Sequence, residues 1–492
     1  MRIPQRTTQH CFFLTSMMAV VILSTIIPAY ALQPERRQGE MAGEVTTNSV
    51  ILQSRLTAAK LDQTGDLPGR IGVARFELST QSDFANSFST AWQTAEPDHD
   101  FLIKSYVPNL KPATRYSYRL QYGSEKTSTK TGPTNTFKTL PTAEQPAEIN
   151  FVVVTGMNYN GFHNGIGKNR PAYQGSDKHL GFPALVSILK LKPDFFVGTG
   201  DNVYYDHPRP NSAQTIDAMR KKWHEQFVQQ RFVDLFAQVP TYWEKDDHDF
   251  RYNDCDLTGS RAPSNEIGLR IFREQVPIVD PKNKKPITYR TYRMGKLLQV
   301  WFTENRDYRS PNHSPNGPEK TIWGVKQRNW LKQTLNDSDA TFKLIISPTP
   351  LIGPDDKSKT DNHTNIGGFQ HERDEFFQWI KQEKLEQRGL YLICGDRHWQ
   401  YHSIAPSGIE EFSTGALVDA NSRLGIKPGS KRGTDPQAEI KQPYTSNPAS
   451  GGFLFVKVKP AKAGTSGTVS FLFYDENGVL LHQVKKTRPL EN

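Results

Sequence analysis

Two strongly apolar segments of this chain end in the same dipeptide, glycine followed by aspartate. Residues 194–199 lead into Gly200-Asp201, and residues 390–394 lead into Gly395-Asp396. A short, nearly continuous apolar run is typical of a strand that is buried on both faces of a parallel sheet. In such sheets, ligands bind outside the carboxyl ends of the strands. The sequence therefore predicts an open α/β sheet that collects carboxylates at one edge.

The segment from about residue 148 to residue 492 alternates between strand-type and helix-type patterns. Further strands are predicted at 149–154, 297–303, 342–347, 452–458, 469–474 and 479–484, and helices at 182–191, 326–335 and 371–383. Strands that alternate with helices form βαβ units and layered α/β domains. The segment 421–450 is rich in Gly, Pro and Lys, which predicts a mobile loop.

Residues 42–141 have the pattern of a separate, small β domain. Short runs of alternating polarity, such as 49–53, 71–76 and 100–104, are separated by Gly, Pro, Asn and Asp. The stretch 110–119, Leu-Lys-Pro-Ala-Thr-Arg-Tyr-Ser-Tyr-Arg, resembles the tyrosine-corner region of fibronectin type III sandwiches. Residues 136–141 are predicted as the last strand and 141–146 as a linker. This pattern places a domain boundary between residues 141 and 148.

The first 31 residues have the pattern of an export signal. Two arginines precede an apolar run from Cys11 to Ile27, and residues 29–31 supply the Ala-Tyr-Ala of a cleavage site. The alternative is an uncleaved membrane anchor, which the shortness of the run disfavours. We therefore expect a periplasmic or extracellular protein that begins near Leu32 and has no stable membrane span after cleavage.

The chain is mildly basic, with a formal net charge of +10. This balance suits an anionic substrate or an anionic envelope surface. Lys and Arg are not gathered into a block with interleaved aromatic residues, so specific nucleic-acid binding is not expected. Since domains average about 150 residues, the length allows two or three of them.

Two further polar clusters accompany the strand ends. Residues 246–249 read Asp-Asp-His-Asp, and Glu304, Arg306 and Arg309 follow the strand predicted at 297–303. Alone, each cluster is typical of a turn, a solvated loop or a surface ion pair. Carboxylates and histidine that are gathered together are costly to bury unless they are paired or bind a metal. Their occurrence together with the two Gly-Asp motifs indicates a metal-dependent active site.

In this order, the motifs resemble those of the PhoD-like phosphatases, the alkaline phosphatase D family of the calcineurin-like metallophosphoesterase superfamily, related to purple acid phosphatases. The matching blocks are Gly-Asp-x-x-Tyr at 200–204, Asp-Asp-His-Asp at 246–249 with Asn253-Asp254, Glu-x-Arg-x-Tyr-Arg at 304–309, Gly-x-x-Gln-x-x-Trp-Leu at 324–331 and Gly-Asp-x-His at 395–398. The resemblance covers nearly the whole chain after the signal. It implies an α/β fold, a four-layer metallophosphoesterase-type β-sandwich flanked by helices, with an N-terminal fibronectin type III-like β-sandwich.

The resemblance also implies a two-metal site. Asp201 would bridge both ions, Tyr204 and His398 would bind the first ion, and Asp247 and Asp396 would bind the second. His363 lies in the right interval for another ligand, the alternative being an ordinary loop histidine. The family implies ferric iron in the first position and calcium or another divalent ion in the second.

The implied chemistry is hydrolysis of a phosphate ester. Two neighbouring cations lower the pKa of a bridging water, so hydroxide can attack phosphorus near neutral pH. The resemblance places His248 beside the substrate as an acid or hydrogen-bond donor to the leaving oxygen. Arg306 or Arg309 would offset charge on the phosphoryl oxygens, and the alternative for each is an ordinary ion pair.

The chain departs from the family pattern at one position. Family members carry a cysteine ligand just after the first strand of the catalytic domain, where this chain has Gly156 in Thr-Gly-Met-Asn-Tyr. The identity of the first metal is therefore open. Either Cys255 or Asp254 compensates, or Cys255 pairs with Cys394 in a disulfide, as an exported location permits. We favour the disulfide.

We therefore predict an exported metal-dependent phosphoesterase that hydrolyses phosphate mono- or diesters and serves phosphate acquisition. A second enzyme hypothesis keeps the metals but takes lipid or teichoic-acid-like phospho-polymers as substrates. The alternative from another class is a non-catalytic surface binding protein on a decayed fold, which the retained ligands disfavour. Metal content separates these hypotheses, because only the enzyme requires stoichiometric metal. A monomer is expected in either case.

Overall fold

The computed structural model describes residue 1, residues 33–461 and residues 465–490. Apart from Met1, the predicted export signal lies outside the described residues. Within them, no helix is both long and apolar enough to cross a membrane.

Two large sheets form the centre of the fold. In the first sheet the strand order is β22 (Leu480–Pro489), β21 (Ser466–Asp475), β20 (Gly452–Pro460), β10 (Ile149–Val154), β11 (Phe195–Thr199), β12 (Thr241–Glu244), β1 (Glu40–Gly43), β2 (Val50–Arg55) and β6 (Leu102–Val107). In the second it is β13 (Arg290–Met294), β14 (Leu298–Phe302), β15 (Phe342–Ser347), β16 (Leu390–Cys394), β18 (Glu410–Thr414), β17 (Gln400–Ile404) and β19 (Lys441–Thr445). Strands β10 to β12 are parallel neighbours, as are β14 to β16, so each sheet presents several carboxyl ends at one edge.

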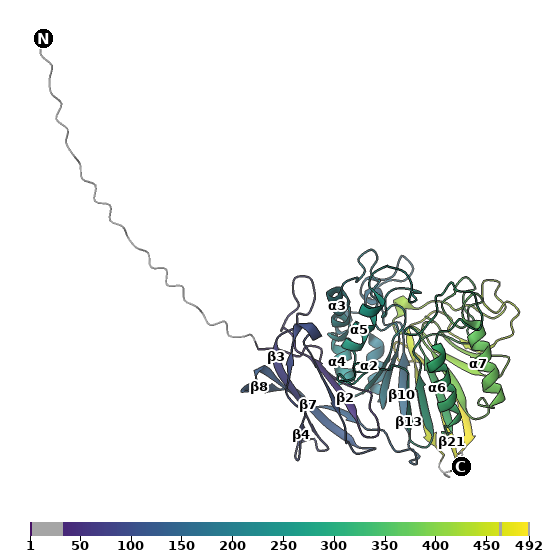
Figure 1. Ribbon diagram of the computed structural model, residues 1–492, viewed down its shortest axis with the longest axis horizontal. Helices are drawn as coiled ribbons and strands as arrows, with labels where there is room; N and C mark the ends of the chain where they lie inside the picture. The colour runs from purple at the N-terminus through teal and green to yellow at the C-terminus, as the bar shows by residue number, and fades with distance from the viewer. Residues whose placement is uncertain (2–32, 462–464, 491–492) are drawn as a thin grey trace. The chain divides into compact units, whose positions relative to one another are not determined.

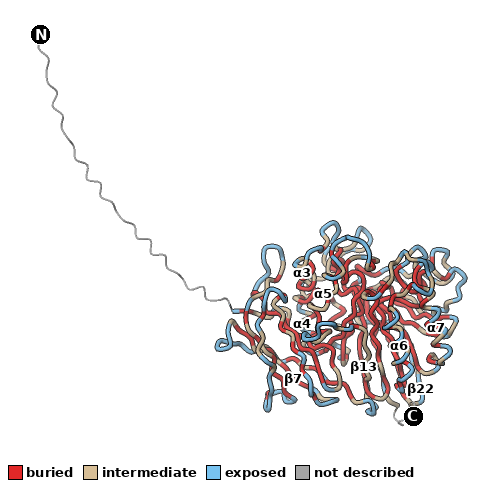
Figure 2. The backbone as a smooth tube through the Cα atoms, in the orientation of Figure 1, coloured by how far each residue is buried: buried red, intermediate tan, exposed pale blue. Residues whose placement is uncertain are grey.

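The two sheets pack face to face through a continuous apolar core (Figure 2). Phe151 and Phe195 of the first sheet stack with ring centroids 4.6 Å apart, and Tyr242 stacks on Phe302 of the second sheet at 5.5 Å. Since these strands are covered on both faces, they read as almost uninterrupted apolar runs.

Helices cover the outer face of each sheet and complete four layers (Figure 1). The helices are α1 (Tyr159–Asn164), α2 (Pro183–Leu191), α3 (Ile216–Phe227), α4 (Gln230–Phe236), α5 (Asn265–Gln275), α6 (Gly324–Asn336) and α7 (Gln370–Gln382), with short 3-10 turns at Pro97–His99, Lys178–Leu180 and Asp419–Asn421. Side chains of α2 to α5 pack on the first sheet, and those of α6 and α7 pack on the second. This arrangement confirms the predicted metallophosphoesterase-type α/β fold.

The front segment contributes a third sheet, built from β3 (Gly72–Ser79), β4 (Phe88–Ser89), β5 (Gln93–Ala95), β7 (Arg115–Glu125), β8 (Ser128–Thr131) and β9 (Asn135–Lys138). Its core includes residues of β2 and β6, which belong to the first sheet. The Tyr116 hydroxyl accepts a hydrogen bond from the Lys111 backbone N–H at 2.9 Å, the contact that defines a tyrosine corner.

The first sheet runs on into the front segment, because β1 pairs in parallel with β12. From Gln33 onward the chain forms one compact unit. Because these residues form one compact unit, the domain boundary between residues 141 and 148 stays a prediction. Within 421–450, expected as a loop, residues 441–445 form β19 on the edge of the second sheet.

Candidate metal centre

The predicted acidic motifs lie at the carboxyl ends of strands from both large sheets. Asp201 follows β11, Asp247 and His248 follow β12, and Asp396 follows β16. The two sheets meet closely at this edge, since a Cβ added to Gly395 would lie 2.5 Å from the Thr199 carbonyl oxygen. The structure thus brings together residues that are far apart in the sequence.

The backbone is held in unusual conformations at these strand ends. Asp201 and Asp396 have φ values of 53° and 57°, in the left-handed region that side chains other than glycine rarely adopt. A Cβ at Gly200 would lie 2.5 Å from the Cβ of Asp246, so only glycine permits the two loops to approach. Strained backbone of this kind concentrates at functional sites, where the surrounding structure holds it in place.

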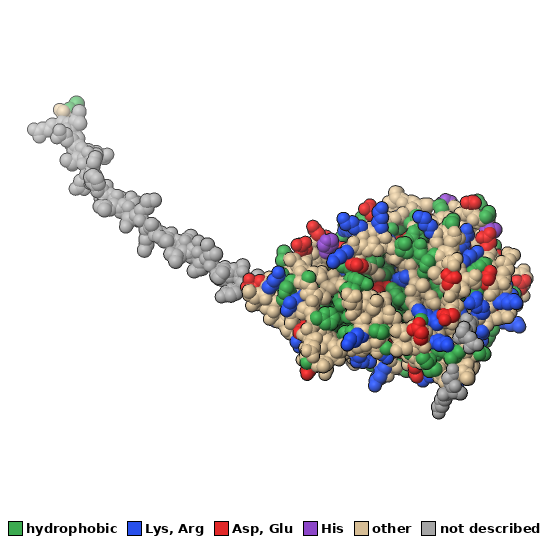
Figure 3. Space-filling view, turned by 60° about the horizontal axis from the view of Figure 1, so that its bottom comes forward, with side chains coloured by type: hydrophobic (Ala, Val, Ile, Leu, Met, Phe, Trp, Pro, Cys, Tyr) green, Lys and Arg blue, Asp and Glu red, His purple; other side chains and the backbone are tan. Residues whose placement is uncertain are grey.

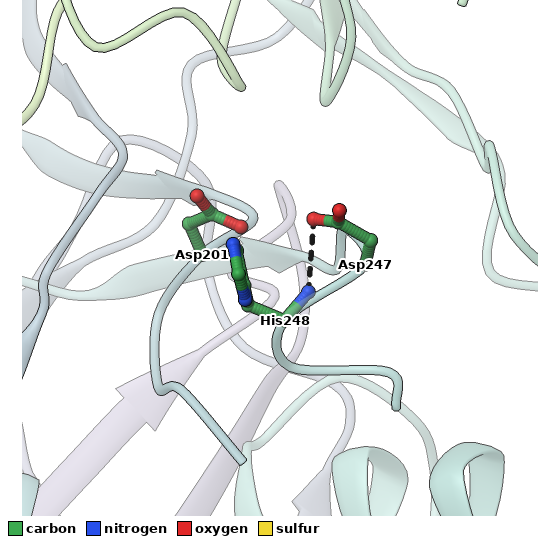
Figure 4. Close-up of side chains that lie close together, drawn as sticks. All are labelled: Asp201, Asp247 and His248. Carbon is green, nitrogen blue, oxygen red and sulfur yellow. Dashed lines mark hydrogen bonds between the residues drawn. The ribbon is translucent and has the colours of Figure 1, made fainter. Parts of the chain in front are cut away.

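We call the group formed by Asp201, Asp247, His248 and Asp396 the cluster. Asp201 lies at its centre and is 1% exposed. Its Oδ2 atom accepts hydrogen bonds from the Tyr204 hydroxyl at 2.7 Å and pairs with His398 Nε2 at 3.0 Å. Its Oδ1 atom is buried and has no hydrogen-bond partner among the residues that the structure describes. Ligand atoms of Asp201, Asp247 and His248 all lie within 4.8 Å of one another (Figure 4). This spacing suits a shared cation.

Negative charge at the cluster is not balanced by the protein's own cations. Burial raises the pKa of Asp201 well above its usual value, and the charges of Asp247, Asp249 and Asp396 raise it further, against the opposing charge of His248. A buried carboxylate with an unpartnered oxygen among other carboxylates is costly unless a cation joins it. The donor set of this structure therefore fits metal ions.

Asp249 joins the two acidic loops. Its carboxylate accepts hydrogen bonds from the backbone N–H groups of Asp246 at 2.7 Å and Asn202 at 3.1 Å. The Asn202 side chain donates to the same carboxylate at 2.5 Å. The last acid of the Asp-Asp-His-Asp motif thus fixes the position of Asp201 relative to Asp247.

Asp396 is the member of the cluster that has its own cationic partners. Arg397 donates to Asp396 and also to Asp355. Burial opposes ionisation, but the positive charges of Arg397 and Lys359 hold the pKa of Asp396 well below its usual value. Lys359 also pairs with Asp254 at 2.7 Å.

His248 is oriented by an acid that the sequence analysis did not single out. Asp206 Oδ1 lies 2.6 Å from His248 Nδ1, and the His248 ring lies 4.2 Å from the Tyr204 ring. Although burial alone would lower it, the charges of Asp247, Asp201 and Asp206 raise the pKa of His248 well above its usual value. The sequence signal that could have identified Asp206 is its position two residues after Tyr204 of the Gly-Asp-x-x-Tyr motif.

The structure does not bring His363 into the cluster. Its Nε2 atom lies 3.0 Å from Glu372 of α7, and its ring packs on Trp323 at 4.6 Å, which fits the alternative of an ordinary loop histidine. The same segment places Asp361 next to Lys359, whose Nζ atom lies 3.8 Å from Asp361 Oδ1. Both carboxylate oxygens of Asp361 are buried without a hydrogen bond from any residue that the structure describes, and burial, with the charges of Asp254 and Asp396, raises its pKa to about 6 against the opposing charge of Lys359.

Arg306 and Arg309 are buried and already occupied by protein acceptors. Arg306 donates through Nε to Asp246 at 2.8 Å and through a terminal nitrogen to the Cys255 carbonyl at 2.7 Å. Arg309 donates to the Asp361 carbonyl and to Asn312 Oδ1 at 2.9 Å. Arg306 thus forms the ordinary ion pair of the alternative, with Asp246, whereas Arg309 contacts only uncharged acceptors.

The predicted disulfide is wrong, because Cys255 and Cys394 are both free and buried. Cys255 Sγ donates to the Asp247 carbonyl at 3.6 Å, whereas Cys394 Sγ lies 3.4 Å from the Tyr401 hydroxyl. Both cysteines flank site motifs in the sequence, but their side chains point to different neighbours. Burial raises the pKa of the Cys255 thiol to about 12, which disfavours the thiolate that a metal ligand requires.

Gly156, which replaces the family cysteine, leaves no room for a side chain. Its φ is 65°, and an added Cβ would lie 2.9 Å from the Ala416 Cβ and 3.2 Å from Asn421 Nδ2. The Asn421 amide occupies this space and donates to the Tyr204 hydroxyl at 2.8 Å and to the Gly156 carbonyl at 3.3 Å. Asn421 belongs to the site, although nothing in its local sequence marks it.

Comparison with known proteins agrees with this geometry. Residues 151–448 match the PhoD-like phosphatase family, and residues 24–141 match the N-terminal domain of PhoD-like phosphatases. Alkaline phosphatase D of Bacillus subtilis (strain 168) is 21% identical over 450 residues, which cover 83% of this chain and 72% of that protein.

Two solved structures share the fold over most of the chain. A structure of PhoD gives a TM-score of 0.70 at 17% identity and covers 92% of this chain and 90% of that chain. Purple acid phosphatase PPD1 from yellow lupin (Lupinus luteus) seeds gives a TM-score of 0.58 at 12% identity and covers 91% and 73%.

The fold is of the metallophosphoesterase type, with an acidic edge at the carboxyl ends of its strands. The family match spans more than half of the sequence. The chain belongs to the PhoD-like phosphatase family and is a phosphoric ester hydrolase by that membership. The resemblance inferred from the ordered motifs is confirmed.

Proposed function

We propose that this chain is a metal-dependent phosphoesterase that hydrolyses small phosphate mono- or diesters outside the cytoplasm and serves phosphate acquisition. The observation that carries the proposal is the buried Asp201 carboxylate, which has an unpartnered oxygen and lies among other carboxylates in a PhoD-like phosphatase. The location outside the cytoplasm rests on the export-signal pattern of residues 1–31.

The proposed site draws oxygen and nitrogen donors for two ions from the strand ends. Asp201, Tyr204 and His398 would hold one ion, and Asp247 and Asp396 would hold the other, with Asp201 shared. Asp361 offers a further carboxylate. When bound, the ions make hydroxide available from water near neutral pH and neutralise charge on the phosphoryl oxygens.

The chain's own residues prepare the leaving group and the ligands. Asp206 engages His248 Nδ1 at 2.6 Å, which leaves Nε2 to donate a proton to the leaving oxygen. The Asn421 amide donates to the Tyr204 oxygen and so stabilises negative charge on it. The ion pair of Arg306 with Asp246 positions the Asp247 loop rather than the substrate.

The deciding experiment combines elemental analysis of the purified protein with hydrolysis of p-nitrophenyl phosphate and bis-p-nitrophenyl phosphate. We expect about two metal ions per chain and turnover that a chelator abolishes and added metal restores. The preferred ester then assigns mono- or diesterase activity. Absence of both metal and turnover after loading with iron, calcium, manganese or zinc would instead support a binding protein on this fold.

The proposed location has its own test. The protein should be recovered from the periplasmic or culture fraction with an N-terminus near Leu32, as N-terminal sequencing or intact mass reports. Retention of the first 31 residues on protein in the cytoplasmic fraction would contradict export without affecting the assignment of the metal site.

A further inference from the structure

One cation beside the metal centre has no protein partner for its charge. Arg306, Arg397 and Lys359 are each paired with carboxylates. The side chain of Arg423, in contrast, is exposed and makes no hydrogen bond or ion pair with any residue that the structure describes. An unpaired guanidinium beside an anion-binding centre is available to a ligand.

Arg423 is fixed next to the cluster by its backbone and by an aromatic ring. Its backbone N–H donates to the His398 carbonyl at 2.9 Å, and its guanidinium carbon lies 5.3 Å from the centre of the Trp399 ring. Trp399 is 3% exposed and therefore forms a rigid support. A guanidinium that stacks on an aromatic face keeps its N–H edges free for bidentate contact with an oxyanion.

The backbone contact places Arg423 beside the proposed ligands. His398, whose carbonyl accepts the Arg423 backbone N–H, lies 3.0 Å through its Nε2 atom from Asp201 Oδ2. The exposed guanidinium of Arg423 therefore belongs to a segment that borders the cluster.

A basic groove begins directly after Arg423. The groove has a cavity volume of about 540 Å³ and is lined by Leu424, Gly425, Ile426, Lys427, Ser430, Arg432, Thr445, Ser446 and Asn447. Its lining includes two cations and no acidic side chain. Gly425 lies against Trp399, since an added Cβ would be 2.3 Å from Trp399 Cδ1, so the groove lies next to the ring that supports Arg423.

We propose that Arg423 binds a phosphoryl oxygen of the substrate at the metal centre, and that the groove with Lys427 and Arg432 favours esters whose leaving group is itself anionic. This inference rests on the proposed phosphoesterase function and adds a substrate-binding residue and a substrate class. A phosphate ester that carries a second phosphate or a carboxylate on its leaving group fits both parts of the site.

The first test uses the metal-loaded protein, with Arg423→Gln compared with wild type. We expect Arg423→Gln to raise KM for p-nitrophenyl phosphate, and the dissociation constant of inorganic phosphate measured by calorimetry, by about tenfold to a hundredfold, because charged hydrogen bonds contribute on this scale. Arg423→Lys should recover part of the loss. The matched control is Lys431→Gln, which removes an exposed charge from the same loop outside the groove lining.

The second test compares glucose 6-phosphate with glucose 1,6-bisphosphate, which differ by one phosphate. Wild type should prefer the bisphosphate in kcat/KM, and Arg432→Gln should reduce that preference several-fold, whereas the control Lys431→Gln should leave the preference unchanged. Unchanged phosphate affinity in a folded Arg423→Gln variant overturns the inference, as does an unchanged preference in Arg432→Gln. If wild type hydrolyses no ester, the proposed function fails, and phosphate calorimetry on the same two proteins still decides the role of Arg423.

Discussion

Asp201→Asn should stabilise the metal-free protein while it abolishes activity. The substitution keeps the size of the side chain and removes one buried negative charge. The bonds from Tyr204 and His398 to Oδ2 can persist, because the asparagine carbonyl can take the place of that oxygen. The change therefore isolates the cost of holding the carboxylate in place without a cation.

The size of the effect follows from the neighbouring charges. At an effective dielectric constant of about 20, unit charges 4.8 Å apart interact by about 3.5 kcal/mol. The attraction to His248 is the larger of these two charge effects on Asp201, and it offsets the repulsion from Asp247. What remains is the desolvation of the unpartnered Oδ1, about 1–3 kcal/mol, and repulsion from Asp249 and Asp396. We expect the metal-free variant to be more stable than metal-free wild type by about 1–3 kcal/mol.

Metal should reverse this order. A ligand at a hundred times its Kd stabilises the folded state by about 2.7 kcal/mol per site, and the variant lacks the shared ligand needed for that gain. Urea denaturation followed by tryptophan fluorescence, with chelator and with saturating metal, measures both differences. Asp83→Asn, an exposed change of the same type, should stay within about 0.5 kcal/mol of wild type. A metal-free Asp201→Asn variant that is less stable than wild type would refute the claim that the cluster is unbalanced without metal.

Three further predictions concern other parts of the structure. Asp206→Asn should lower kcat by about tenfold to a hundredfold with unchanged metal content, because it removes the carboxylate that orients the proposed acid His248. Steady-state kinetics and elemental analysis would measure the two quantities. Burial opposes ionisation of Asp100, but the hydrogen bond and charge of His224, with the charge of Arg55, bring its pKa from 3.8 to about 2. Asp100 should therefore contribute about 2 kcal/mol of stability above pH 4, which is lost as the pH falls to 2. Denaturation of wild type and Asp100→Asn at both pH values would show whether their difference shrinks. Gly156→Cys should cost about 1–3 kcal/mol without adding a metal ligand, because the φ of Gly156 is 65° and the new Cβ would lie 2.9 Å from the Ala416 Cβ. A variant as stable as wild type would contradict this.

Much of the fold was accessible from sequence because burial leaves a pattern. Strands that are covered on both faces, such as 149–154, 342–347 and 390–394, are predicted with the limits that the structure has. Helix α3 is not predicted, since its buried face carries Arg220, His224 and Gln226 as well as apolar residues. These polar side chains are paired across the fold, for example His224 with Asp100 at 2.7 Å, and such pairing is invisible to a periodicity argument.

The acidic motifs could be grouped in advance because parallel strands deliver their carboxyl ends to one edge. Asp206, Asp361 and Asn421 could not be assigned, since their roles depend on contacts made by loops whose paths no local pattern fixes. The disulfide prediction failed for the same reason. Cys255 and Cys394 are close to site motifs in the sequence, but this closeness does not determine the direction in which their side chains point.

In the proposed two-metal site, the glycine that replaces the family cysteine would change the charge around the first ion as well as its geometry. A thiolate would add one negative charge, whereas the Asn421 amide is neutral and donates its hydrogen bond to the Tyr204 oxygen. Burial raises the pKa of Tyr204 well above its usual value, and the charge of Asp201 adds to this, while the Asn421 hydrogen bond works in the opposite direction. The Tyr204 phenol therefore needs an adjacent cation in order to ionise, and the Asn421 hydrogen bond further stabilises the ionised form. The proposed position has one anionic ligand fewer than the family pattern. It should therefore prefer a divalent ion to a trivalent one more strongly than a cysteine-containing relative does, because the attraction that holds each added unit of cation charge is smaller.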